Sequence, residues 1–200
     1  MRHHWWLVAI GLILAAAVAF TFGLSGQLRS LSGPLFTGGG TSGTPAVRPA
    51  ARSVPVAISI PAIHLSVRLS ELGLNPNHTV QVPTNFLEPG WYEYGPSPGQ
   101  LGSSVILGHV DSYLGPAVFF RLRALRPGDH VDVWLADGVV SHFLVRQVAM
   151  YPKTNFPTRQ VYGSHGYSTL QLVTCGGVFD TQTRSYLSNV VVYTSLVSTS

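Results

Sequence analysis

Residues 169–177 read TLQLVTCGG and residues 105–111 read VILGHVD. Each stretch opens with apolar, largely β-branched residues, which favour a buried strand. The first run ends at Cys175, and two glycines follow; the second ends at Gly108, and His109 follows. We therefore expect two strands whose ends carry a thiol and an imidazole, held in place by a rigid scaffold.

Cys175 is the only cysteine of the 200-residue chain, which excludes an intrachain disulfide and any multi-cysteine metal site. A lone thiol is either a small buried apolar group or a reactive one. Two adjacent glycines favour the reactive interpretation, because they remove side chains beside the sulfur and let a peptide backbone approach. A thiol nucleophile also needs a neighbouring base or cation, and histidine serves at neutral pH.

His109 is the candidate partner because it alone follows an apolar strand and a glycine. An ordinary structural role is expected for the other histidines, His3, His4, His64, His78, His130, His142 and His165. Arg184, the only arginine after Cys175, is the third candidate. Its guanidinium stays charged and could hold a developing oxyanion, although a loop arginine is often only a surface residue.

From Val54 onward the pattern is that of β structure. Asp137-Gly138 predicts a hairpin, and one short helix is expected over residues 117–125, whose apolar side chains repeat at helical spacing after Pro116. Alternating apolar runs predict strands at residues 56–60, 79–82, 104–108, 130–136, 140–150, 169–174 and 189–196. This many short strands in about 145 residues predict a single all-β domain, a barrel or a sandwich.

The N-terminal segment has a different composition. Trp5–Leu24 is an uncharged, mainly apolar run whose length at ~1.5 Å per residue matches the ~30 Å core of a bilayer. We predict residues 1–24 as a cytoplasmic tip and transmembrane anchor; a cleaved signal peptide is the alternative, because residues 17–19 read AVA. Residues 25–53 are a predicted flexible linker, since 20 of the 29 are Gly, Ser, Thr, Pro or Ala.

Charge restricts the class of partner. The formal net charge is +4 and the basic residues are scattered along the chain. A surface that follows nucleic-acid phosphates needs a clustered basic stripe, so no nucleic-acid partner is expected. A modest positive charge suits an anionic cell envelope instead.

These motifs together resemble the sortase family. The cysteine stretch 172–175 is similar to the TLxTC signature, with Gln171 where that signature has its leading threonine, and 107–111 is similar to the family's histidine motif. Arg184 before the closing strand at Asn189–Val192 matches as well. Residues 90–96 and 108–112 are most like class F sortases of high-GC Gram-positive bacteria, and the likeness covers about residues 54–196.

The resemblance implies a closed β-barrel of about eight strands with one or two short helices, at residues 54–200, behind a single-pass N-terminal helix that leaves the catalytic domain extracellular. Sortases cut a sorting signal such as LPxTG between Thr and Gly and pass the acyl group to an amine of a cell-wall precursor or surface protein. Carried over, Cys175 forms the thioacyl intermediate, His109 is the acid and base, and Arg184 stabilises the oxyanion and orients the signal. No metal and no cofactor are expected.

Two alternatives stay open at the level of sequence. Ser164-His165-Gly166 resembles the motif of L,D-transpeptidases, which also use a cysteine on peptidoglycan, but that family places its cysteine close behind the triplet, where this chain has Tyr167. A non-enzymatic adhesion module on a stalk would share the anchor, the linker and the β domain. The position of Cys175 relative to His109 and His165 discriminates among the three.

Overall fold

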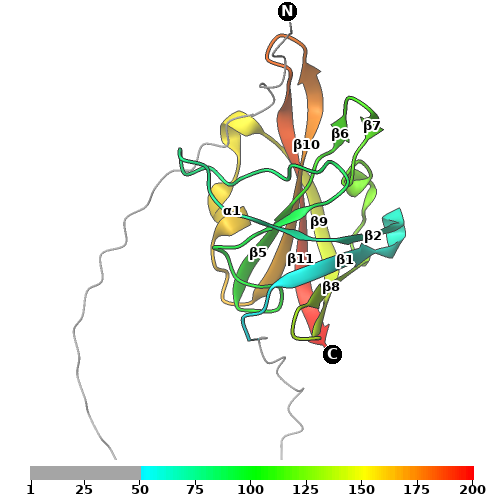
Figure 1. The fold of residues 1–200 in the computed structure, drawn as a ribbon, viewed down its shortest axis with the longest axis vertical. Helices are drawn as coiled ribbons and strands as arrows, with labels where there is room; N and C mark the ends of the chain where they lie inside the picture. Colours follow the sequence, from blue (N-terminus) through cyan, green and yellow to red (C-terminus); the bar gives the residue numbers. More distant parts are fainter. Residues whose placement is uncertain (1–50) are drawn as a thin grey trace, which may run out of the picture.

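The computed structural model of the protein describes residues 51–200 (Figure 1). The predicted anchor at residues 1–24 lies outside the described residues, as does the predicted linker except for its last three residues. Among residues 51–200, no helix combines the length and the apolar character needed to cross a membrane.

One sheet organises the described part of the chain. Its strands, in spatial order, are β2 (Leu65–Arg68), β1 (Pro55–Ile60), β8 (His130–Leu135), β9 (Val140–Pro152), β11 (Ser185–Thr199), β10 (Ser168–Asp180), β5 (Gly102–Leu107), β4 (Gly90–Tyr92) and β3 (Ser70–Leu72). A separate small ribbon pairs β6 (Asp111–Ser112) with β7 (Gly115–Pro116). Most pairs are antiparallel, but β5 runs parallel to β10 and β3 runs parallel to β4.

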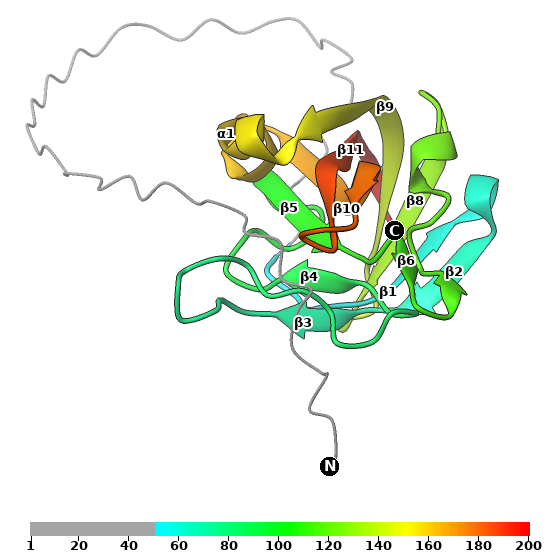
Figure 2. The same ribbon diagram turned by 90° about the horizontal axis from the view of Figure 1, so that it is seen from above.

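The sheet is nearly closed into a barrel. Its two outermost strands, β2 and β3, are separated along the chain by Leu69 alone, so the two ends of the strand order are consecutive pieces of one segment. Leu69 N donates to Val56 O at 3.0 Å, and Ser70 N donates to Pro89 O at 3.0 Å. The chain thus switches its partners at Leu69, and the view in Figure 2 shows the strands curled around a common interior.

Two apolar clusters cover the two faces of the central strands. Alternation along a strand sends successive side chains to opposite faces. Leu170 and Leu172 of β10 therefore join the interior cluster with Ile106 of β5, whereas Val173 joins an outer cluster with Leu107. The short helix α1 (Thr158–Tyr162) covers the outer cluster and contributes the buried Val161. Because both faces are covered, β10 and β5 form the rigid centre of the fold.

The hairpin predicted at Asp137-Gly138 is confirmed. It joins β8 to β9, and Gly138 adopts φ +88°, a left-handed conformation that glycine accommodates without a steric cost. Gly138 N donates to Leu135 O at 3.0 Å and Val139 N to Asp137 Oδ1 at 3.1 Å, so backbone and side chain both close the turn.

Two of the predicted elements are wrong. Residues 117–125 do not form an α-helix; only a 3₁₀ turn, η2 (Leu122–Ala124), is present. The reason is that Ala117 N donates to Val110 O and Phe119 N donates to His109 O. These hydrogen bonds hold the backbone of residues 117–119 against the preceding segment and not in a helix. Residues 79–82 form no strand beyond one isolated bridge from Val80 to Leu74. Two further 3₁₀ turns are η1 (Pro61–Ile63) and η3 (Lys153–Asn155).

Candidate active site

Cys175 does not end its strand, contrary to the expectation from sequence. β10 continues to Asp180 and forms a long hairpin with β11, in which Cys175 lies opposite Asn189. A register shift after Gly176 lets the hairpin continue, and Gly177 takes φ +79° there. Gly176 is required by packing, because an added Cβ would lie 2.8 Å from Val190 Cγ2. The glycines therefore serve the bulge and the packing of the hairpin, and the thiol remains half-buried.

His109 follows its strand as predicted, and the parallel register of β5 with β10 relates its position to that of Cys175. Leu107, the last residue of β5, lies opposite Val173 of β10, and Gly108 N continues the ladder to Val173 O at 3.1 Å. His109 and Cys175 each come two residues after these partners, in the same chain direction. Adjacent strands lie about 4.8 Å apart, so the two residues follow paired positions of neighbouring strands at one end of the barrel.

The imidazole of His109 is held by two contacts. Its Nε2 lies 2.7 Å from Pro83 O, and its ring centroid lies 4.7 Å from that of Phe86. A carbonyl oxygen can only accept a hydrogen bond, so Nε2 carries the proton. In the neutral form of the ring the lone pair is therefore on Nδ1.

Cys175 also lines a cavity of about 220 Å³ at the hairpin end of the barrel. The wall is mainly apolar, with one cation from Arg123 and one phenol from Tyr186. Its lining residues are Val110, Phe119, Phe120, Arg123, Met150, Thr174, Cys175, Gly176, Gly177, Tyr186 and Val190. The thiol thus borders a small cavity and is partly shielded from water.

Asp111 and Tyr186 complete the surroundings of the thiol, and neither was a candidate from sequence. Tyr186 of β11 donates its hydroxyl proton to Asp111 Oδ2, which raises the pKa of Tyr186 to about 12 because the carboxylate holds that proton in place. Burial raises the pKa of Cys175; the positive charge of Lys153 lowers it, and the negative charge of Asp111 raises it again. Burial is the largest of these causes, so the protonated thiol is favoured over the thiolate.

Arg184 is placed apart from the other two sequence candidates. It lies in the turn between β10 and β11, just after Asp180, with φ +51° and an exposed side chain. Asp180 is five residues beyond Cys175 on the extended strand, roughly 16 Å at ~3.3 Å per residue. Arg184 is not among the residues that line the Cys175 cavity, whereas Arg123 is.

A family model described as a sortase domain matches residues 58–197. The chain belongs to the sortase family. The match covers both motifs from which the resemblance was argued and leaves out only the first part of the chain and its last three residues. No curated protein sequence matches the chain.

Solved sortase structures share the fold. Sortase A from Corynebacterium diphtheriae is 18% identical, with a TM-score of 0.58, over 74% of this chain and 62% of that one. Sortase C1 from Streptococcus agalactiae is 20% identical (TM-score 0.56; 71% and 66% of the two chains). Sortase A from Listeria monocytogenes is 14% identical (TM-score 0.55; 74% and 90%). The chain thus spans slightly less than two thirds of the first two relatives.

The competing histidine lies elsewhere in the sortase fold. His165 Nε2 contacts Gln160 O at 2.9 Å, close to α1. It precedes β10, which begins at Ser168, whereas Cys175 is at the far end of the buried part of that strand. His165 is therefore near α1 and ten residues before Cys175, and the arrangement expected of an L,D-transpeptidase, with the cysteine close behind the Ser-His-Gly triplet, is absent from residues 51–200.

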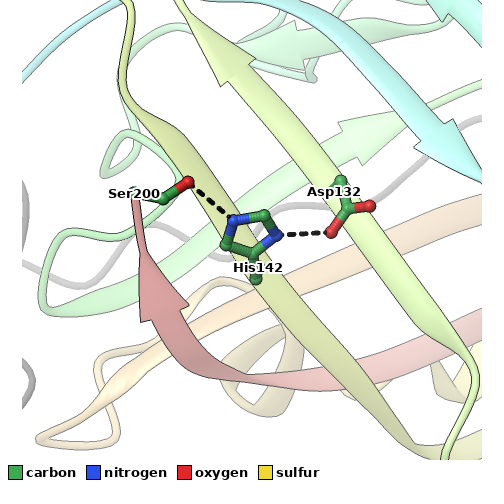
Figure 3. Close-up of polar contacts among 3 residues, drawn as sticks. All are labelled: Asp132, His142 and Ser200. Atoms are coloured by element: carbon green, nitrogen blue, oxygen red, sulfur yellow. Dashed lines mark hydrogen bonds and ion pairs between the residues drawn. The ribbon is translucent and has the colours of Figure 1, made fainter.

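A second histidine cluster resembles a catalytic triad but has another role. His142 Nδ1 lies 2.7 Å from Asp132 Oδ1, and His142 Nε2 lies 2.9 Å from Ser200 Oγ (Figure 3). Ser200 is exposed, and its backbone exchanges two hydrogen bonds with Val140. The three side chains thus fasten the end of β11 to β8 and β9.

Proposed function

We propose that this sortase-family protein is a cysteine transpeptidase that cleaves an LPxTG-like sorting signal through a thioacyl intermediate. It then transfers the acyl group to an amine of a cell-wall precursor or of another surface protein. The observation that supports the proposal is the register of β5 and β10, in which His109 and Cys175 each follow the paired residues Leu107 and Val173 by two positions. Two strands that are far apart in sequence meet at the two residue types that acyl transfer needs.

The first half-reaction forms the thioester. Cys175 Sγ attacks the carbonyl carbon of the scissile peptide bond while the thiol proton passes to His109 Nδ1. The imidazolium then gives that proton to the departing amine, the C–N bond breaks, and the acyl group remains on sulfur. Because burial raises the pKa of Cys175, proton transfer to His109 has to accompany the attack at neutral pH.

The second half-reaction transfers the acyl group from sulfur to a new amine. An incoming amine attacks the thioester carbon and loses its proton to His109, and the C–S bond breaks. The leaving thiolate regains a proton from the imidazolium, which restores the starting state. The contact of His109 Nε2 with Pro83 O fixes the ring through both halves, so the same nitrogen receives and returns every proton.

The sequence also supports a sortase class and a membrane anchor for this enzyme. The segments 90–96 and 108–112 support class F, although Gln171 departs from the TLxTC pattern. Gln171 is buried in β10, and its Nε2 donates to Thr169 Oγ1 at 3.1 Å, so its role is internal to the strand. The apolar run of residues 5–24 supports a membrane-anchored enzyme with an extracellular catalytic domain.

A panel of pentapeptide sorting signals tests the function. The protein is incubated with each peptide, and intact-mass spectrometry is used to detect an adduct on Cys175. We expect one LPxTG-like peptide to leave its N-terminal fragment on the sulfur as a thioester that an added amine removes. If no peptide of the panel gives an adduct or a cleavage product, the proposed function is wrong.

Arg184 is retained as a residue that orients the signal, and Arg184→Gly tests it. Glycine adopts the left-handed turn conformation of this position without strain, so the hairpin is kept while the guanidinium is lost. We expect KM to rise severalfold and kcat to fall less than about tenfold, measured by steady-state peptide cleavage. Loss of an oxyanion donor instead lowers kcat by about 10²–10³.

A fall in kcat of that larger size would assign Arg184 the oxyanion role implied by the resemblance. Unchanged KM and kcat would remove Arg184 from the mechanism. Arg123, which lines the cavity beside Cys175, would then be the next arginine to replace.

A further inference from the structure

Lys153 is a charged residue that the proposed reaction does not yet use. It is the only lysine of the chain and is the first residue of η3, directly after β9. Its Nζ donates to Ser185 Oγ at 2.9 Å in a half-buried setting. A lysine side chain has high conformational freedom when free in water, so this contact holds the ammonium in one region.

The register of three strands places Lys153 close to the row of paired residues that contains Cys175. Cys175 of β10 lies opposite Asn189 of β11, and Asn189 lies opposite Tyr151 of β9. Lys153 follows Tyr151 by two residues, with Pro152 in an extended conformation between them (ψ 139°). Lys153 therefore lies just beyond the end of β9, two residues after the row of paired residues that contains Cys175.

We propose that Lys153 supplies the positive charge that activates Cys175, a role that Arg184 at the exposed hairpin turn does not fill. The inference rests on the proposed function for its place in catalysis. Lys153 acts through the sulfur and is thus a positioning residue, not a catalytic one. Ser185 takes one of its three N–H donors, so two stay free to favour the thiolate or a nearby substrate carbonyl.

The other charged groups around the sulfur do not provide this effect. Asp111 opposes it, since its negative charge raises the pKa of Cys175, while Lys153 lowers that pKa. Tyr186 is neutral and bonded to Asp111, and His109 is the proton acceptor of the reaction. Arg123 lines the cavity that Cys175 also lines, but the charges that shift the pKa of Cys175 are those of Lys153 and Asp111.

The test is the pH dependence of Cys175 alkylation by iodoacetamide, measured by intact mass. The single cysteine makes each alkylation event unambiguous, and only the thiolate reacts. Loss of the charge in Lys153→Met raises the thiol pKa, so we expect the profile to move by about half to one pH unit upward. The rate at pH 7 then falls roughly three- to tenfold, and Lys153→Arg restores it to within about twofold.

Arg146→Met is the matched control. Arg146 Nε also donates to a serine hydroxyl of β11, Ser195, at 2.6 Å, but at the opposite end of that strand from Ser185. We expect its alkylation profile to coincide with that of the wild type. Ser185→Ala, which keeps the lysine but removes its anchor, should give a smaller shift in the same direction as Lys153→Met.

Coincident profiles of wild type and Lys153→Met, with circular dichroism showing both folded, would overturn the inference. So would a Lys153→Arg variant as slow as Lys153→Met, because the side chain would then act by its shape. Alkylation needs no peptide, so the result is independent of the proposed function. A shifted profile in a protein that cleaves no signal would keep the role of Lys153 and reject the transpeptidase.

Discussion

Replacing Cys175 by alanine is expected to lower cleavage of the sorting-signal peptide on the order of 10⁴-fold or more and to leave the fold intact. No other side chain of the chain offers a thiol, so the covalent intermediate cannot form, and losses of this size follow removal of a nucleophile. The Cys175 side chain is only half-buried, so removing its sulfur costs about 1 kcal/mol of stability or less. Peptide cleavage followed by chromatography, with thermal melting by circular dichroism, measures both effects.

Val178→Ala provides the control for this variant. Val178 lies on the same strand, three residues beyond Cys175, and is exposed. We expect its cleavage rate and melting temperature to stay close to the wild-type values. A Cys175→Ala protein that still cleaves the signal at a comparable rate would show that sulfur is not the nucleophile, and acyl transfer through Cys175 would have to be abandoned.

The sequence correctly predicts the strands whose side chains are buried on one face or on both faces of the sheet. β10 reads as an apolar run because the interior cluster covers Leu172 and the outer cluster covers Val173. The short strands β2, β3 and β4 were missed, because three or four residues with polar members carry little periodicity. Ser70 belongs to β3 because it is paired with Gly90, and that pairing exists only in the folded barrel.

The same distinction applies to the site. Cys175 and His109 could be proposed from the sequence because each adjoins an apolar run and glycine: two glycines follow Cys175, and Gly108 precedes His109. Asp111 and Tyr186 could not be, since their contact joins residues 75 positions apart through a hairpin whose length was underestimated. Lys153 was missed for the same reason: it meets Ser185 only because β11 begins well before the predicted residue 189. Long hairpins extend pairing beyond the residues whose own propensity favours a strand.

The second large effect is expected for His109→Gln. The amide nitrogen of glutamine can donate to Pro83 O as Nε2 of His109 does, so the loop contact is kept. Glutamine does not exchange a proton near neutral pH, so the thiol loses its base and the leaving amine loses its acid. We expect kcat/KM for the signal peptide to fall by about 10²–10⁴, measured by steady-state cleavage at pH 7.

His165→Gln is the matched control, because His165 Nε2 also contacts a backbone carbonyl, that of Gln160, at 2.9 Å. It removes an imidazole of the same bonding type from the region of α1, and kcat/KM should stay within about twofold of wild type. The two variants therefore show whether cleavage depends on the imidazole that follows β5 or is equally sensitive to loss of another imidazole with the same kind of contact. If His165→Gln is the slow variant and His109→Gln is not, proton transfer takes place at the beginning of β10, and the pairing of His109 with Cys175 has no catalytic role.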